Sequence, residues 1–415
     1  MPAQPQHQRP IAEIDFREID DASVVAPDRS AKESSPYEAP RNHIEELLAH
    51  IWEQTLDISR VGVHDDFFNL GGHSMLATLV VAQISDEFHV DIPVRQFFAA
   101  PTVAQLAKVI TQDDDDTTNE DPSRILMAIQ PLGSGTPFFC VHPVAGDVLC
   151  YVDLSREIGT DQPFYGLQAP APDSALAPLD SIEKMAALYK QEIQRVQPHG
   201  PYLIGGWSMG GIVAFEMARQ LRQTSEEIAL LVLMDASLPE PYRHRTDNTE
   251  SHTILTLFAL NMSYQVGKNP RELQQQFMQL GEQEQRKMIF DILMQERLLP
   301  RDASRAEKKF QNQLNVYARN MHAFATYPLQ RAEQKIVFCE AAESGRDWSL
   351  AEDWRPWTGE IESYVIPGSH HSMFKRPHVS ILGQHIRRCI AVARDIAGSP
   401  FSAASNGSFQ KHESV

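Results

Sequence analysis

The chain has 415 residues, of which 42% are hydrophobic and 22% charged, a balance typical of globular proteins with buried cores. Its length exceeds what one hydrophobic core usually serves, so we expect two or three domains. The formal net charge of −18 argues against a nucleic-acid-binding protein, because the neutralisation of phosphates requires a basic surface.

No sequence signal predicts export or membrane insertion. The N-terminal stretch is polar, and no run approaches the roughly 18 apolar residues that would span a bilayer. The four cysteines are Cys140, Cys150, Cys339 and Cys389. They are widely scattered and show no metal-ligand spacing, which argues against a zinc site or a disulfide framework. We therefore expect a cytoplasmic protein without a bound metal.

The N-terminal part predicts a small helical domain between two polar segments. Residues 1–37 are rich in Pro, Ser and acidic residues and predict a flexible leader. Within residues 38–111, helical spacing of apolar residues occurs at 43–57, from Ser74 onward, at 94–98 and at 102–110. Four helices in so short a segment predict a four-helix bundle. Residues 112–122 contain an acidic run and predict a linker.

Residues 123–397 show a different pattern, in which short apolar runs alternate with amphipathic segments. The predicted strands are 138–141, 164–167, 202–207, 228–234, 335–339 and 361–365. This alternation predicts a doubly wound, mostly parallel sheet. Residues 238–328 interrupt it with helical patterns at 253–262, 271–299 and 306–325, which predict an inserted helical lid. Residues 398–415 are rich in Ser, Gly and Asn and predict a disordered tail.

Residues 206–210 read G-W-S-M-G, the pattern of a nucleophile elbow, and lie between a predicted strand and a predicted helix. The two glycines remove side chains where the strand and the helix meet. The turn exposes the Ser208 hydroxyl at a helix N-terminus, where backbone N–H groups favour a developing anion. We therefore predict that Ser208 is the nucleophile of an α/β-hydrolase and that the backbone N–H of Met209 is one oxyanion donor.

A serine nucleophile requires a base that is oriented by a carboxylate, and in this fold the order along the chain is serine, acid, histidine. Asp235 ends the strand that follows Ser208 and is the predicted acid, while Asp347, after the next strand, is its rival. The base should follow the last strand, where His370 and His371 are adjacent. The pattern does not choose between these two histidines.

The loop after the first of these strands, residues 142–146, reads H-P-V-A-G and should supply the second oxyanion donor. We choose the backbone N–H of Val144. His142 is a further candidate base, but its position before Pro143 favours a role in shaping the loop.

Residues 65–76 read D-D-F-F-N-L-G-G-H-S-M-L, a loop with two glycines that delivers Ser74 to a helix start. Local physics alone predicts an N-cap serine. The stretch resembles the D-x-F-F-x-L-G-G-x-S core of peptidyl carrier proteins, and the likeness extends over residues 37–110. It implies that Ser74 carries a 4′-phosphopantetheine arm, which a phosphopantetheinyl transferase loads from coenzyme A. Polyketide carriers usually have Asp before the serine, so His73 at this position favours the peptide class.

Residues 136–395 resemble the type I thioesterases of nonribosomal peptide synthetases. The matching pieces are G-P-Y-L-I-G-G-W-S-M-G-G at 200–211, the acid Asp235, and G-S-H-H-S-M at 368–373. The last piece matches the family's G-x-H-x-x-M, which implies that His370 is the base. A helical lid between acid and base is a further feature of that family. Residues 9–15 resemble the end of an adenylation domain, so the leader is interpreted as a remnant of one.

Together these resemblances imply a terminal didomain in which upstream condensation and adenylation modules build a peptidyl thioester on Ser74. Ser208, with His370 and Asp235, then takes the acyl group, and hydrolysis or macrocyclisation ends synthesis. An editing thioesterase is a further implied partner. A flexible linker of about 11 residues spans roughly 18 Å, so delivery should be intramolecular.

Two other interpretations stay open at this point. One is a polyketide-type, lipase-like or editing hydrolase fused to an unrelated helical domain. The other is a non-catalytic carrier platform, against which the intact Ser208, Asp235 and His370 argue.

Overall fold

The computed structural model describes residues 37–88, 90, 92, 94–111, 125–170, 174, 176, 179–239, 251–343, 346 and 348–397. Outside this set lie residues 1–36 of the predicted leader, the predicted linker and tail, and the rival acid Asp347. None of the described helices is long and apolar enough to cross a membrane.

Four helices pack around one apolar core ahead of the sheet. They are α1 (His43–Leu56), α2 (Ser74–Phe88), α3 (Val94–Ala99) and α4 (Val103–Thr111). The ring of Phe67 lies edge-on to Trp52 and to Phe97, with both pairs of ring centroids 4.9 Å apart, and all three side chains are fully buried. Edge-to-face aromatic contacts of this kind fix the geometry of a small core. Phe67 therefore anchors the loop that leads to Ser74.

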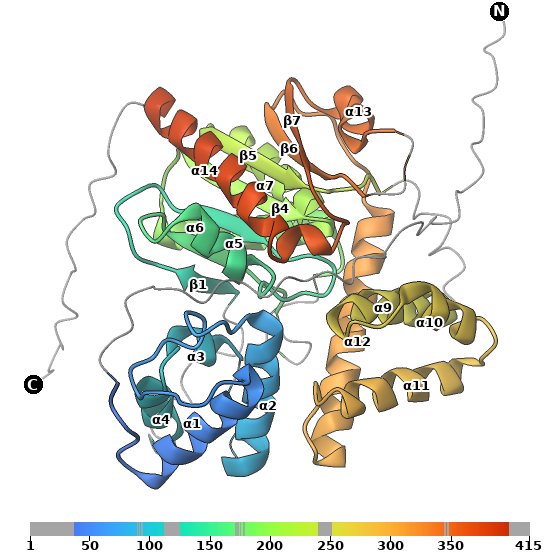
Figure 1. Ribbon diagram of the computed structural model, residues 1–415. Helices are drawn as coiled ribbons and strands as arrows, with labels where there is room; N and C mark the ends of the chain where they lie inside the picture. Colours follow the sequence, from blue (N-terminus) through green and yellow to red (C-terminus); the bar gives the residue numbers. More distant parts are fainter. Residues whose placement is uncertain are drawn as a thin grey trace, which may run out of the picture.

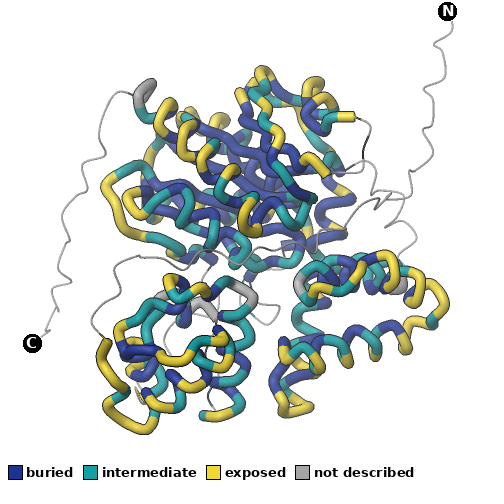
Figure 2. The backbone as a smooth tube through the Cα atoms, viewed as in Figure 1, coloured by how far each residue is buried: buried dark blue, intermediate teal, exposed yellow. Residues whose placement is uncertain are grey.

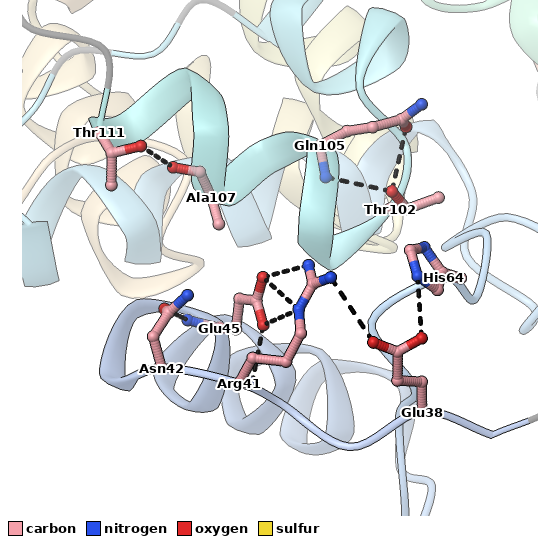
Figure 3. Close-up of polar contacts among 9 residues, drawn as sticks. All are labelled: Glu38, Arg41, Asn42, Glu45, His64, Thr102, Gln105, Ala107 and Thr111. Atoms are coloured by element: carbon pink, nitrogen blue, oxygen red, sulfur yellow. Dashed lines mark hydrogen bonds and ion pairs between the residues drawn. The ribbon is translucent and has the colours of Figure 1, made fainter.

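Polar contacts fix the chain where α1 begins (Figure 3). The side chain of Asn42 caps the helix by accepting from the backbone N–H of Glu45 at 3.0 Å. Arg41 donates to both carboxylate oxygens of Glu45, and this hydrogen bond lowers the pKa of the buried Glu45 carboxyl. Glu38 lies within 3.5 Å of Arg41 and 3.2 Å of His64, so it joins the helix start to the following loop.

The second part of the chain is built on a seven-stranded sheet in the order β1-β3-β2-β4-β5-β6-β7. Its strands are β1 (Leu126–Gln130), β2 (Phe138–Val141), β3 (Phe164–Leu167), β4 (Tyr202–Trp207), β5 (Ile228–Met234), β6 (Ile336–Ala341) and β7 (Ile361–Ile366). All neighbouring strands are parallel except β1 and β3. The predicted mostly parallel sheet is confirmed, while the antiparallel edge strand β1 was not predicted.

Helices cover both faces of this sheet (Figure 1). On one face lie α5 (Tyr151–Ile158) and α14 (His378–Ala397), and on the other α6 (Ile182–Val196) and α7 (Met209–Gln223). The short α13 (Leu350–Trp354) follows β6. The strands between these layers are mostly buried (Figure 2), which explains why they appear in the sequence as continuous apolar runs.

In the described residues between β5 and β6 lie four inserted helices. They are α9 (Ser251–Gln265), α10 (Pro270–Phe277), α11 (Glu282–Gln295) and α12 (Ala303–Thr326). The single helical pattern predicted at 271–299 is wrong, because α10 and α11 are separate helices. Gly281 occupies the N-cap of α11 and donates its N–H to the side chain of Glu284 at 3.0 Å, so the chain starts a new helix there.

Among the contacts between the four N-terminal helices, with their loops, and the second part of the chain are two that involve arginines. The guanidinium of Arg156 on α5 lies 4.1 Å from the ring centroid of Phe68 and 3.8 Å from Asp66. Just before α12, Arg301 donates its backbone N–H to Asp86 of α2 at 3.0 Å. The four N-terminal helices therefore lie against both the sheet domain and the inserted helices (Figure 1).

Candidate active site

The turn between β4 and α7 places Ser208 in a strained conformation, with φ 56° and ψ −128°. The flanking glycines make this turn possible. A Cβ on Gly206 would lie 2.2 Å from backbone atoms of Gly210, and one on Gly210 would lie 2.3 Å from the Val141 carbonyl oxygen. Strain of this kind at a strand-to-helix turn is typical of a nucleophile elbow.

Two residues at the same edge of the sheet form a close pair. Asp235 directly follows β5, and His370 lies in the loop after β7, 135 residues away in sequence. The two side chains meet with Nδ1 of His370 2.5 Å from Oδ2 of Asp235. A carboxylate can only accept, so the ring carries its proton on Nδ1 and leaves Nε2 free of a proton in the neutral state.

The environment of Asp235 favours the charged carboxylate. The side chain is fully buried, and burial by itself opposes ionisation. The hydrogen bond and charge of His370, the charge of Arg346 at 3.9 Å and the backbone N–H of Ala341 outweigh that effect. The pKa of Asp235 is therefore lowered from its ordinary value, and the group is ionised at neutral pH.

The two adjacent histidines have different surroundings. The ring of His370 packs on Trp207, the residue before Ser208, with ring centroids 5.0 Å apart. The ring of His371 lies edge-on to Trp207 at 5.5 Å and stacks on Tyr264 of α9, with ring centroids 3.9 Å apart. Burial, together with the charges of His370 and Lys375, lowers the pKa of His371 well below its ordinary value. Only the first of the two is hydrogen-bonded to Asp235 in the described contacts.

The loop after β2 is held by a buried histidine. Nδ1 of His142 donates to the Pro143 carbonyl, and the hydroxyl of Tyr189 on α6 donates to Nε2, both at 2.7 Å. Burial lowers the pKa of His142 to about 4, so the ring is neutral at physiological pH. Both ring nitrogens have structural partners, which fits a residue that shapes this loop.

The backbone of Ser74 begins α2, a helix of 15 residues. The preceding loop is shaped by two glycines, of which Gly71 has φ +104° and Gly72 lies so close to Phe67 that a Cβ would be 2.3 Å from its ring. The start of a helix favours a phosphodiester, because its N–H groups and dipole attract negative charge. The local backbone therefore fits an attached phosphopantetheine.

The residue before this serine lies close to the sheet domain. Burial is the main cause that lowers the pKa of His73, while Asp153 of α5 and Lys375, in the loop that follows His370, act on it by charge. The start of α2 thus lies within electrostatic reach of the segment that carries His370.

Comparison with known families decides the identity of the sheet domain. The profile described as the thioesterase domain matches residues 136–389, more than half of the chain. The chain belongs to the thioesterase family. The mostly parallel sheet of this thioesterase, with helices on both faces, is an α/β-hydrolase fold. Residues 46–110 match the profile described as the phosphopantetheine attachment site, so the thioesterase carries a domain for that cofactor.

The relatives of this thioesterase are large synthetases. Malpinin synthetase of Mortierella alpina is 41% identical over 225 residues, which are 54% of this chain and 3% of that protein. The dimodular nonribosomal peptide synthase of Bacillus subtilis is 30% identical over 397 residues, which are 92% of this chain and 16% of that protein. The chain therefore spans less than a fifth of either relative.

One solved structure is likewise a larger synthetase, of which this chain matches only a part. The crystal structure of a holo four-domain nonribosomal peptide synthetase bound to AMP and glycine matches 87% of this chain with a TM-score of 0.59 and 29% identity. The match covers 27% of that synthetase.

Several residues around the site were not predicted. Arg346 lies beside Asp235, Tyr189 holds His142, and Tyr264 stacks on His371. Tyr151 of α5 donates its hydroxyl to the Val141 carbonyl at 2.6 Å and accepts from the Trp207 N–H at 2.9 Å, so it ties the ends of β2 and β4 together. None of these partners belongs to a local motif, so the sequence offered no signal for them.

Replacement of His142 by Asn should reduce the pH dependence of folding stability. The folded-state pKa of about 4 lies below the ordinary value of 6.5, so the unfolded chain binds the proton more readily. The contribution of His142 to the free energy of unfolding is complete above pH 6.5. It is lost as the pH falls from 6.5 towards 4, by up to about 3 kcal/mol. Urea unfolding between pH 4 and 7 measures it, and the exposed His322→Asn is the matched control. Equal pH slopes for wild type and His142→Asn would contradict this assignment.

Proposed function

We propose that this chain is the carrier and thioesterase part of a nonribosomal peptide synthetase and releases the finished peptide. The main supporting observation is the hydrogen bond between His370 and Asp235 at the sheet edge where the Ser208 turn lies. It occurs in a chain that also carries a phosphopantetheine attachment domain. Relatives named as nonribosomal peptide synthases agree with this role.

Ser208, His370 and Asp235 act as nucleophile, base and orienting acid. Nε2 of His370 takes the hydroxyl proton of Ser208 as the oxygen attacks the acyl carbonyl. The buried carboxylate of Asp235 holds the ring in the required tautomer and stabilises the imidazolium that forms. The proton then passes to the departing sulfur, and the acyl group stays on Ser208 as an ester.

The backbone N–H groups of Met209 and Val144 hold the negative charge that develops on the carbonyl oxygen. Met209 is the first residue of α7, where N–H groups lack partners within the helix and the dipole favours an anion. Val144 lies in the loop at the end of β2, the neighbour of β4 in the sheet. Donors placed before the reaction avoid the cost of reorganisation.

Ser74 is the proposed attachment residue, and the four N-terminal helices form the carrier bundle. When bound, 4′-phosphopantetheine supplies the acyl group as a thioester. Ser74 is the first residue of α2, where the helix N-terminus favours the phosphodiester. A phosphopantetheinyl transferase is the partner that this modification requires.

The carrier is proposed to deliver its acyl group within the same chain. The contact of Arg156 with Phe68 and the contact of Arg301 with Asp86 hold the carrier against the thioesterase. The charge of Lys375 acts on His73, next to the attachment residue, and supports an orientation that faces the catalytic loop. The linker, residues 112–122, keeps the effective concentration of the carrier high.

The remaining domain assignments follow the same scheme. The carrier spans residues 38–111 and the thioesterase residues 123–397, in which residues 238–328 with α9–α12 form a lid over the acyl chain. Residues 9–15 are proposed to belong to the end of an adenylation domain.

Release from Ser208 follows when water, or a nucleophile of the peptide itself, attacks the ester with His370 as base. Upstream condensation and adenylation modules supply the peptide. An editing thioesterase is a further proposed partner, which would clear wrongly loaded arms.

Incubation with coenzyme A and a broad-specificity phosphopantetheinyl transferase should add one arm to the wild-type chain. Ser74→Ala should gain no mass, because its side chain offers no hydroxyl for the phosphodiester. Intact-protein mass spectrometry measures both. An unmodified wild type, or an arm on Ser74→Ala, would overturn the carrier assignment.

Substitutions at the acid and the two histidines should separate their roles. Loss of the base in His370→Ala should slow release from a loaded arm by about 10³-fold or more, and Asp235→Asn should slow it by about 10³–10⁴-fold. His371→Ala should stay within about 10-fold of wild type, because that ring stacks on Tyr264 instead. Single-turnover release rates measure this series. Arrest of His371→Ala together with rapid release by His370→Ala would reverse the two assignments.

A further inference from the structure

A buried side chain of the inserted helices contacts the loop that follows β2. Asn320 lies fully buried in the C-terminal half of α12, and its Nδ2 donates to the Val144 carbonyl at 2.9 Å. The Oδ1 of the same amide has no protein hydrogen-bond partner among the described residues. The side-chain amide of Asn320 is therefore oriented so that its N–H donor points at the loop after β2.

Both peptide units that flank Val144 are held by hydrogen bonds. The Pro143 carbonyl accepts from His142 Nδ1 at 2.7 Å and from the Gly146 N–H at 2.9 Å. In a trans peptide the N–H points opposite to the C=O, so the Val144 N–H is directed away from these two donors. The next unit is held through the Val144 carbonyl by Asn320.

Only the φ and ψ angles of Val144 connect these two planes. The peptide plane before Val144 is held by the donors to the Pro143 carbonyl, and the plane after it by Asn320. The direction of the Val144 N–H is therefore fixed by contacts on both sides of this residue. Loss of the Asn320 donor would release one plane and leave a buried carbonyl without this partner.

We infer that Asn320 is a positioning residue for the oxyanion hole, and that α12 takes part in acyl transfer in addition to covering the site. The inference rests on the proposed function, since it requires the Val144 N–H to face the reacting carbonyl oxygen. Asn320 contacts the Val144 carbonyl and acts through the backbone of Val144.

The position of Asn320 is well anchored. Around it, Tyr317, Met321 and Phe324 are buried in the core that packs against α6 and α7. After the helix, Tyr327 donates its hydroxyl to Glu216 of α7 at 2.7 Å, which ties α12 to the helix that begins after Ser208. Val316 lies directly over Gly146, where a Cβ would be 2.5 Å from its Cγ1. The C-terminal half of α12 and the loop after β2 thus pack together as one unit.

Asn320→Leu in the full chain tests this role, because it removes the donor and keeps a similar volume. With p-nitrophenyl acetate as substrate, kcat should fall by about 10–100-fold and KM should change by less than about twofold, since a preorganised donor has lost its position. The affinity for phenylethylboronic acid should fall by the same factor as kcat/KM. Its tetrahedral adduct forms when the Ser208 oxygen adds to boron and its proton passes to His370, so it mimics the intermediate.

Asn315→Leu is the matched control, because Asn315 is an exposed asparagine on the same helix that pairs with Gln311. It should keep wild-type kcat and boronate affinity. An Asn320→Leu protein with wild-type kcat, or with reduced kcat and unchanged boronate affinity, would overturn the positioning role and leave the proposed function intact. A wild-type chain that neither turns over the ester nor binds the boronate would contradict the proposed function and, with it, this inference.

Discussion

The hydrogen bond between His370 and Asp235 depends on the arrangement of the whole sheet domain. It joins residues 135 positions apart and requires β5 and β7 to end at the same edge of the sheet, on either side of β6. The chain leaves the sheet after β5 for an insertion that includes α9 to α12, and β6 must then pair with β5 in register. It does so where Met234 pairs with Cys339, and Asp235 donates its N–H to the Cys339 carbonyl at 2.7 Å. The insertion therefore begins directly after Asp235, and β6 then brings the chain back alongside β5 to the same end of the sheet.

The inserted helices connect the parts of the molecule that have to act together. At the start of α12, the chain contacts Asp86 of the carrier, and further along the same helix Asn320 holds the Val144 carbonyl. At the end of α9, Tyr264 stacks on His371 and its carbonyl accepts from Lys375. One insertion thus contacts the N-terminal helical domain, the loop after β2 and the loop that carries His370.

The features that the sequence predicts well have local causes. The Ser208 turn depends on glycines within two residues, and β2 to β5 are short apolar runs with the predicted bounds. The edge strand β1 was missed although residues 125–129 form a short apolar run, I-L-M-A-I, and most of the strand is only half-buried. The partnership of Asn320 with Val144 spans 176 residues and involves a backbone carbonyl, which no periodicity or motif reveals. For the same reason the stacking of Tyr264 that separates His371 from His370 became visible only in the fold.

Transfer of an acyl group from Ser74 to Ser208 within one chain is the central step of the proposed function. The most direct test is to load the arm with a peptidyl-pantetheine, quench the reaction at intervals and locate the acyl mass by peptide mapping. The acyl group should disappear from the Ser74 peptide and appear on the Ser208 peptide before product accumulates, at a rate that does not change on hundredfold dilution. In Ser208→Ala it should remain on the arm. Release of product by Ser208→Ala at the wild-type rate would contradict the account.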